Sequence, residues 1–313
     1  MRHSFDEVDL KQGRQSWRKM SLAMALLPVF TSGLTGCVSM FTSKRRLPVP
    51  VAPAVVQTVT SEQLVAQMNE RWEKFESMTA TVDIVASHLL EKQGEAMDYP
   101  SFRANLLIRK PEMLRILGKA PLVQTPMFDL GSDGKEFRLS VPPKNKAYEG
   151  RSDEKGTSPH WYENLRPGFL FRAFVVRGLA EDEYYSTIAE TLTEEDAAKR
   201  HLLVRPEYVL SIVRRKASSH ALIPVRVVRF DRETLLPTEQ DLYGDNGNLE
   251  TQVVYGPYQD FDGIKYPGTI LLKRPQEAYQ LSITVERVTA NPPLDDEQFQ
   301  VKFPTGVTPK ILK

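Results

Sequence analysis

The chain has 313 residues, with 41 basic and 40 acidic side chains, a formal net charge of +1 and one cysteine. This charge balance argues against nucleic-acid binding, which is typical of strongly basic domains, and one cysteine excludes an intrachain disulfide or a multi-cysteine metal site. With 41% hydrophobic residues, the composition is typical neither of a polytopic membrane protein nor of a disordered chain.

The first 36 residues have the pattern of a signal peptide. A polar stretch that ends in Arg18 and Lys19 is followed by the short apolar segment 21–34, and this order is typical of a secretory signal. The segment is shorter than the ~20 apolar residues that a bilayer-spanning helix needs. We therefore expect residues 1–36 to be removed, although the long polar stretch leaves the true start codon open.

The end of this segment resembles the bacterial lipobox, in which the signal is cut before a cysteine. The matching residues are Leu34, Thr35, Gly36 and Cys37. The resemblance implies that Cys37 becomes the first residue of the mature protein and carries acyl chains on sulfur and nitrogen. Two or more chains hold a protein firmly on a membrane, whereas one chain holds it only marginally. The alternative is an ordinary buried cysteine beside an uncleaved N-terminal helix.

Residues 37–60 are expected to form the lipidated N-terminus and a tether, because Pro48, Pro50 and Pro53 favour an extended spacer. In lipoproteins of this kind, an Asp after the cysteine favours retention in the inner membrane in some bacteria. Val38 occupies that position. The resemblance therefore implies a lipid-anchored protein of the cell envelope, at the outer membrane and facing the periplasm.

Residues 61–313 are predicted to form one domain that begins with a helix. Thr60 and Gln63 fit a capping box, and apolar residues then recur at helical spacing. From Thr79 the apolar period changes to two, which predicts successive antiparallel strands up to Val141. Residues 161–199 are predicted to be helical. Strands resume between 208 and 288, which gives about eleven strands in all.

The sequence contains no recognisable catalytic or metal-binding pattern. Its five histidines show no ligand spacing, and it has neither a Gly-x-Ser-x-Gly elbow nor a phosphate-binding glycine loop. Carboxylate runs such as 194–196 and 295–297 are typical of a solvated surface, not of a catalytic acid in an apolar site. We expect a protein that is not an enzyme and has no metal and no cofactor. A hydrolase of envelope polymers is the alternative.

Several short motifs follow one another in an order similar to that of the LolA/LolB-like lipoprotein carriers and acceptors. Each motif is weak alone, and their order along residues 61–306 carries the resemblance. The motifs are the helix 64–78, Ala104–Pro111, Leu114–Ile116, Ala120–Thr125, Phe128–Phe137, Phe230–Pro237, Tyr255–Tyr258, Asp262–Pro267 and Phe299–Gly306.

This resemblance implies an α+β fold, an open antiparallel half β-barrel of about eleven strands capped by helices. In this superfamily the space between sheet and helices is apolar and holds acyl chains. The lipobox fits the outer-membrane acceptor LolB, which receives lipoproteins from the soluble carrier LolA, so a periplasmic LolA-like carrier is an implied partner. Leu122 matches an exposed leucine on the membrane-delivery loop of LolB, and Val123 replaces the glycine that often follows it.

Apolar residues that alternate along neighbouring strands are predicted to share the face that lines this cavity. The alternative for each of them is a filled core packed on the helices. The candidate cavity residues are Val82, Ile84, Phe102, Leu106, Ile108, Leu114, Ile116, Phe128, Leu130, Phe137, Leu139, Leu281 and Ile283.

The sequence thus predicts a membrane-anchored lipoprotein that binds acyl chains of lipoproteins or lipids and helps deliver them to the outer membrane. Sequestering an acyl chain contributes about 0.8 kcal/mol per buried methylene, so no catalytic group is required. The alternative function is an envelope protein that uses the same fold to bind a protein partner, in stress sensing or in assembly.

Overall fold

The computed structural model describes residues 56–90, 95–120, 125–152, 161–195, 200–217 and 219–312. Contacts divide the chain into units 1–49 and 50–313, and every described residue lies in the second unit. The lipobox Leu34, Thr35 and Gly36, the lipidation site Cys37, most of the tether and the loop residues Leu122 and Val123 lie outside the described residues.

The first described element is helix α1 (Ser61–Lys74), and it begins where the capping box predicts. The Gln63 amide donates to the Thr60 hydroxyl over 3.3 Å, and the Thr60 amide donates to the Gln63 side chain over 2.9 Å. These two bonds satisfy donors that a helix start otherwise leaves unpaired. The apolar face then buries Leu64, Val65 and Met68.

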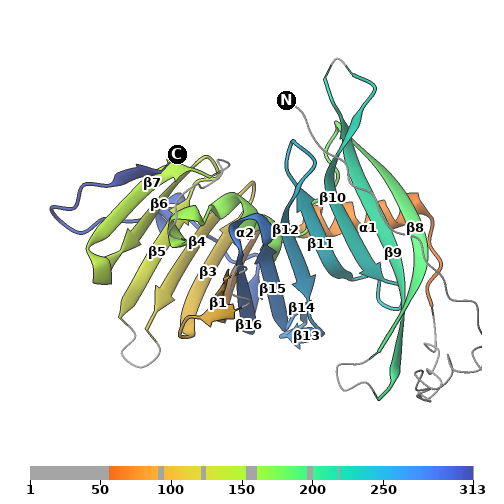
Figure 1. Ribbon diagram of the computed structural model, residues 1–313, viewed down its shortest axis with the longest axis horizontal. Coiled ribbons are helices and arrows are strands. Elements are labelled where there is room, and N and C mark those ends of the chain that lie inside the picture. Colours follow the sequence, from red (N-terminus) through yellow and green to blue (C-terminus); the bar gives the residue numbers. More distant parts are fainter. Residues whose placement is uncertain are drawn as a thin grey trace, which may run out of the picture. The chain divides into compact units, whose positions relative to one another are not determined.

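Most strands of the described chain belong to one sheet of fifteen strands (Figure 1). Its order is β17-β7-β6-β5-β4-β3-β1-β16-β15-β12-β11-β10-β9-β8, with β2 paired to β1 and a separate hairpin β13-β14. The strands are β1 (Ser77–Leu90), β2 (Glu95–Asp98), β3 (Phe102–Arg109), β4 (Met113–Lys119), β5 (Pro126–Ser132), β6 (Glu136–Val141), β7 (Lys146–Arg151), β8 (Glu183–Glu195), β9 (Leu202–Arg215), β10 (Leu222–Asp231), β11 (Pro237–Tyr243), β12 (Leu249–Tyr255), β13 (Tyr258–Phe261), β14 (Ile264–Pro267), β15 (Thr269–Arg274), β16 (Tyr279–Ala290) and β17 (Lys310–Leu312).

The sheet is open in the described chain, because β17 and β8 end the strand order and do not pair with each other. Pairing is antiparallel throughout except between β17 and β7, which are parallel. The central pair is β1 and β16, in which Ile84 faces Ile283 and Val82 faces Val285. The predicted open antiparallel sheet is therefore confirmed.

Two details of the sequence-based prediction are not confirmed. The count of about eleven strands omits β2, β7, β8, β13, β14 and β17, five of which have six residues or fewer. The helix predicted over 161–199 is wrong beyond Phe174. Only α2 (Pro167–Phe174) and the 3₁₀ turn Trp161–Asn164 are helical there, and residues 183–195 form β8.

Both α-helices of the described chain lie on the same face of the sheet, which we call the inner face. The α1 residues Leu64, Val65 and Met68 join a cluster with Leu210, Val228 and other inward side chains of β9 and β10. The α2 residues join a second, larger cluster with side chains of β1, β3 to β7, β12, β15, β16 and β17. The hairpin β13-β14 packs partly buried aromatic side chains on the second cluster. Among the described residues no helix is long and apolar enough to cross a bilayer.

Candidate functional site

The structure brings the thirteen candidate cavity residues together on the inner face. Phe102 and Phe128 are partly buried, and the other eleven are buried members of one hydrophobic cluster. The same cluster contains Phe169, Leu170 and Phe171 of α2. The space that the candidate residues on β4 and β5 face is therefore occupied by this helix, and the hairpin β13-β14 packs against β16. Their role as walls of an acyl-chain cavity stays a prediction.

Two aromatic candidates form a contact near one end of this surface. The rings of Phe102 and Phe128 meet edge to face with their centroids 5.2 Å apart. Gly118 lies directly opposite Phe128 on β4. A Cβ atom at Gly118 would lie 2.4 Å from the Phe128 ring, so the absence of a side chain there makes room for the ring.

Helix α2 is almost completely enclosed. Seven of its eight residues are buried, and only Arg172 is not. Pro167 starts the helix, as is usual at a first helical position, but no side chain caps its N-terminus. Since isolated helices shorter than ~12 residues are marginal in water, the packing of α2 on the sheet must supply its stability.

Polar side chains of the sheet and of the β13-β14 hairpin hold the C-terminal end of α2. The carbonyl oxygens of its last three residues accept hydrogen bonds from Gln240 (2.8 Å, to Arg172), Tyr255 (3.1 Å, to Ala173) and Tyr266 (2.8 Å, to Phe174). A helix leaves these carbonyls without partners inside the helix. Burial raises the pKa of both tyrosines, so each hydroxyl stays a donor.

A buried arginine fixes the chain just after α2. Arg226 is 1% exposed and donates over 2.7 Å to the carbonyl oxygens of Arg177 and of Gly178. Glu183 lies 3.6 Å from the Arg226 guanidinium and forms a second ion pair with Arg177. Burial, together with the charge of Arg177, lowers the pKa of Arg226 to about 9. The segment between α2 and β8 is thus tied to β10.

Sequence patterns did not single out these anchoring residues. Gln240, Tyr255 and Arg226 occupy inward positions of strands, where the alternating pattern predicts apolar side chains. A polar residue at such a position was the available signal, because a buried polar group needs a partner. Which carbonyl it would meet depends on where α2 docks, and the strand pattern carries no such information.

The opposite, outer face of the sheet carries a different feature, a C-terminal strap formed by residues 291–312. Arg109 of β3 donates to the Leu294 carbonyl, and Arg115 of β4 donates to the Gln298 carbonyl over 2.8 Å. On β6, the Arg138 guanidinium lies 5.5 Å from the centre of the Phe303 ring. The strap therefore crosses β3, β4 and β6 before β17 pairs with β7.

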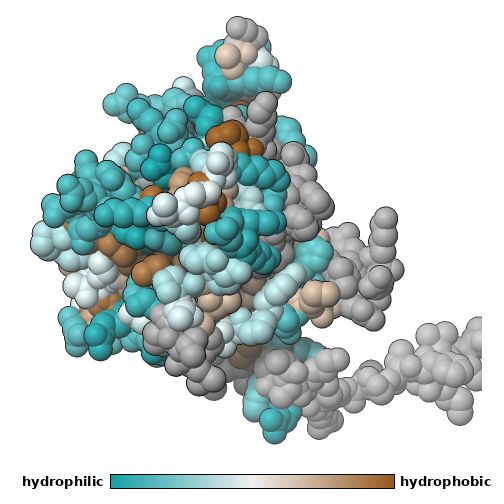
Figure 2. All heavy atoms as spheres, turned by 90° about the vertical axis from the view of Figure 1, so that its left-hand side faces the viewer, coloured by the Kyte–Doolittle hydropathy of each residue, from teal (hydrophilic) through white to brown (hydrophobic). Residues whose placement is uncertain are grey.

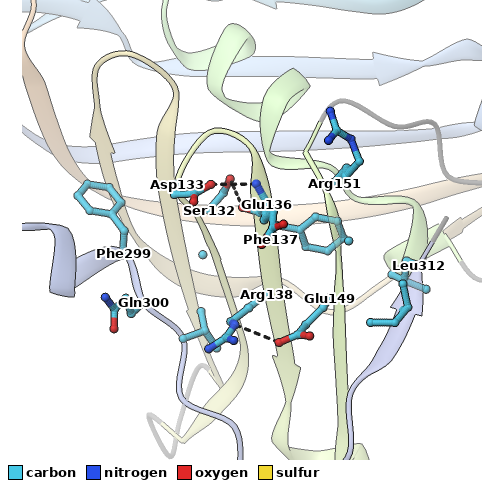
Figure 3. Close-up of a pocket in the computed structure, with 14 residues that line it drawn as sticks. Ser132, Asp133, Glu136, Phe137, Arg138, Glu149, Arg151, Phe299, Gln300 and Leu312 are labelled. Atoms are coloured by element: carbon cyan, nitrogen blue, oxygen red, sulfur yellow. Dashed lines mark hydrogen bonds and ion pairs between the residues drawn. The ribbon is translucent and has the colours of Figure 1, made fainter.

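A groove of about 700 Å³ lies between this strap and strands β5 to β7 (Figure 3). Its floor holds an ion pair between Arg138 and Glu149, 3.1 Å apart. In Figure 3, Phe299 and Gln300 stand on one side of this pair and Leu312 on the other. The groove is lined by Gly131, Ser132, Asp133, Glu136, Phe137, Arg138, Glu149, Gly150, Arg151, Phe299, Gln300, Val301, Ile311 and Leu312.

The groove and the candidate cavity are separate features that share one residue, Phe137. Figure 2 faces the β7 end of the sheet and shows a mainly hydrophilic surface with small hydrophobic areas. Within the described ranges, no three His, Asp or Glu side chains are grouped so that they could hold a metal ion. The chemistry that the described residues offer is therefore apolar contact on the inner face and mixed polar contact in the groove.

Comparisons with known proteins return structures but no sequence relatives. No family model matches the chain, and no curated protein matches it. A DUF1329 family protein from Desulfovibrio piger is similar, with a TM-score of 0.48 and 13% identity over 76% of this chain and 95% of that one.

Two further structures bear names that agree with the sequence resemblance. A LolA superfamily protein from Nitrosomonas europaea has a TM-score of 0.47 and 13% identity, over 78% of this chain and 99% of that one. A domain from Vibrio parahaemolyticus named for outer membrane lipoprotein sorting has a TM-score of 0.46 and 15% identity, over 76% and 94%. Scores and identities this low carry no conclusion about which ligand this chain binds.

Proposed function

We propose that this domain binds the acyl chains of lipids or lipoproteins on its inner face, in the space that α2 occupies in this structure. The observation that carries the proposal is the burial of α2, seven of whose eight residues are buried against the sheet. If α2 moves away, apolar side chains of the sheet such as Leu130 and Leu139 lose their cover. An acyl chain that replaced the helix would bury this surface again, with about 0.8 kcal/mol gained per methylene.

The way in which α2 is held supports its replacement by a ligand. Its own length gives it little stability, and its N-terminus has no side-chain cap. Gln240, Tyr255 and Tyr266 hold the C-terminal end through three hydrogen bonds. A net contribution of about 1 kcal/mol is typical of one such bond. Besides its apolar packing on the sheet, the docked helix is thus held by three hydrogen bonds that single substitutions can remove.

The proposal predicts that weakening this anchor strengthens binding of an acyl chain. In the variant Tyr255→Phe/Tyr266→Phe, two hydrogen bonds to α2 are lost, which favours the state in which the helix has left. Because apparent affinity scales with the population of the competent state, we expect fatty-acid binding to tighten by about fivefold for each ~1 kcal/mol removed. The measurement is fluorescence titration with a long-chain fatty acid carrying a fluorescent label.

The matched control is Tyr258→Phe, since the Tyr258 hydroxyl donates to the Pro237 carbonyl on β11 and not to α2. Its affinity should equal that of the parent chain. Failure of all three proteins to bind the labelled fatty acid, with no lipid in an organic extract of the purified protein, would contradict the proposed ligand. Weaker binding by the double variant would contradict replacement of α2.

We further propose that Cys37 is lipidated and anchors the protein, and that the bound lipid or lipoprotein is delivered to the outer membrane. The lipobox Leu34–Cys37 supports this proposal. In cells, Cys37→Ser should move the protein from the membrane fraction to the soluble fraction, with a matched Ser39→Ala variant as the control. Mass spectrometry of the mature N-terminus should find acyl chains on Cys37. Persistence of Cys37→Ser in the membrane fraction would contradict the anchor.

The groove on the outer face favours a second candidate function, the binding of a protein partner. It is open, and its floor presents the Arg138–Glu149 ion pair between walls that carry both apolar and polar side chains, a mixture typical of protein interfaces. Substitutions of Arg138 and Glu149 should then abolish co-purification of a partner but leave fatty-acid binding unchanged.

A further inference from the structure

An open sheet has two edges, and those of this sheet are built differently. At one edge, β17 has three residues and is followed by no further described strand. At the other edge, β8 has thirteen residues and pairs with β9 on one side; no described strand lies on its other side. A long free edge presents a row of backbone donors and acceptors to which another strand can add.

Strand β8 lacks most of the usual features that prevent such addition, although four of its thirteen residues are glutamates. Its sequence contains no lysine, no proline and no glycine, and its register with β9 runs from Glu183 to Glu195 without a bulge. On its outer face, Tyr184 is 58% exposed and Ile188 is 60% exposed. Natural edge strands are blunted by charge, proline or bulges, so an edge of this kind indicates an interface.

We propose that β8 pairs antiparallel with β8 of a second copy of this chain, about a two-fold axis at Ile188. Such an interface is self-complementary, as two-fold symmetry requires. Ile188 then faces Ile188 of the second copy, and Tyr184 faces Leu192 in both directions. Cross-strand apolar pairs of this kind stabilise a sheet by roughly 0.2–1 kcal/mol each. The fifteen-stranded sheet continues into its symmetry mate.

The spacing of side chains along β8 favours a second copy of this chain as the partner that pairs with this edge. On the outer face the apolar residues Tyr184, Ile188 and Leu192 recur every four positions, symmetrically about Ile188. The polar residues Ser186 and Glu190 lie between them and face each other across the axis. A strand whose pattern reads alike in both directions matches its own antiparallel copy.

Other centres of symmetry fit less well. An axis at Ala189 sets Ile188 opposite Glu190 and Tyr184 opposite Glu194. An axis at Glu190 places the Glu190 carboxylate opposite the Glu190 carboxylate of the second copy, and like charges directly opposite are destabilising. An axis at Ser186 leaves Leu192 outside the paired segment.

The acidic ends of β8 do not prevent this register. The axis at Ile188 places Asp182 near Glu194 of the second copy. Within each chain, Glu194 already pairs with Arg205, and Asp182 lies 3.9 Å from Arg214. Glu190, further along, pairs with Arg229 over 2.7 Å. These arginines come from β9 and β10, so they reduce repulsion and leave the backbone edge of β8 open.

The first test is the oligomeric state of the full chain carrying Cys37→Ser, measured by sedimentation velocity over a range of concentrations. We expect dimers, and we expect Ile188→Lys, which places two ammonium groups at the axis, to weaken dimerisation by at least about tenfold (~1.4 kcal/mol). The matched control is Leu222→Lys, because Leu222 is 57% exposed but lies on β10, away from the edge. A monomeric parent chain, or dimers unaffected by Ile188→Lys, overturns the proposal.

The second test determines the register by disulfide formation in the same Cys37→Ser chain. Directly opposed residues of antiparallel strands have Cα atoms about 4.5–5.5 Å apart, which a disulfide can bridge. Ile188→Cys should therefore form a covalent dimer on oxidation, and so should Ser186→Cys/Glu190→Cys. Ser186→Cys alone should not, since its two copies lie beyond the ~7 Å limit. Cross-linking by Ser186→Cys but not by Ile188→Cys overturns the register.

Discussion

Glu207 is a residue at which burial and charge are in conflict. It lies on β9 with 4% of its surface exposed, and one of its carboxylate oxygens has no hydrogen-bond partner in the described chain. Burial raises the pKa of Glu207, and the carboxylates of Glu190 and Glu239 add to the rise, whereas Arg205 and Arg229 oppose it. The carboxyl of Glu207 therefore holds its proton more tightly in the folded state than in the unfolded chain.

This conflict predicts how stability depends on pH. Because the folded pKa lies above the unfolded value of ~4.3, the native state binds the proton more tightly, and stability falls as pH rises between the two values. Glu207→Gln removes the charge and should raise the free energy of unfolding at pH 7 by about 1 kcal/mol. The gain should shrink as the pH falls to ~4, where the carboxyl is mostly protonated in both states.

Urea unfolding followed by circular dichroism at both pH values measures this difference. Glu233→Gln, at an exposed position of the turn between β10 and β11, removes the same charge from the surface and should change stability little at either pH. An equal effect of Glu207→Gln at pH 7 and at pH 4 would show that its charge is not the cause.

At the same scale, sequence patterns predicted apolar positions better than polar ones. Alternation along β3 and β4 places Leu106, Ile108, Leu114 and Ile116 on the inner face, and all four are buried there. Alternation could not identify Tyr266 as an anchor of α2, because its hydrogen bond joins residues 92 positions apart in the chain. Contacts of that kind depend on how the elements pack.

At the scale of elements, β8 shows why a helix was predicted where a strand forms. The segment has acidic residues at intervals that suit a helix, but it also contains Tyr184, Tyr185, Thr187, Ile188 and Thr191. Aromatic and β-branched residues favour strands, most strongly where a neighbouring strand is available to pack against. β9 supplies that neighbour along the whole length of β8. Tertiary pairing therefore outweighs the local charge pattern.

The C-terminal strap depends on the absence of a side chain at one position of β5. A Cβ atom at Gly131 would lie 2.3 Å from the Phe299 carbonyl oxygen and 2.8 Å from a methyl carbon of Val301. Gly131→Ala should therefore push the strap off the sheet, with a loss of stability of about 1–3 kcal/mol. Hydrogen exchange of residues 299–312 should rise strongly.

Ser282→Ala is the control for that experiment, because Ser282 is exposed on β16. It should leave exchange in the strap unchanged. If Gly131→Ala leaves exchange of residues 299–312 at the level of the parent chain, the strap does not rest on β5 as closely as the structure indicates.

At the scale of the whole molecule, the open sheet and its helix-covered face follow from pattern, whereas the strand order does not. The eleven strands that alternation predicts are all present. Their order depends on the pairing of β1 with β16, in which Met78 faces Ala290. No local signal marks two strands that far apart as neighbours. The candidate site shows the same division, since its apolar face and a helix within 161–199 are predictable and the place where that helix docks is not.

The same long-range pairing has a consequence for the timing of folding during synthesis. Strand β16 is the central neighbour of β1, and the strap covers the outer face of β3 to β6. Both come from residues 279–312, which are made after every strand that they contact. Until those residues emerge, β1 lacks its neighbour β16, β7 lacks its neighbour β17, and the strap does not yet cover the outer face of β3 to β6. A nascent chain therefore stays incompletely folded until late, which exposes apolar strands to aggregation in the meantime.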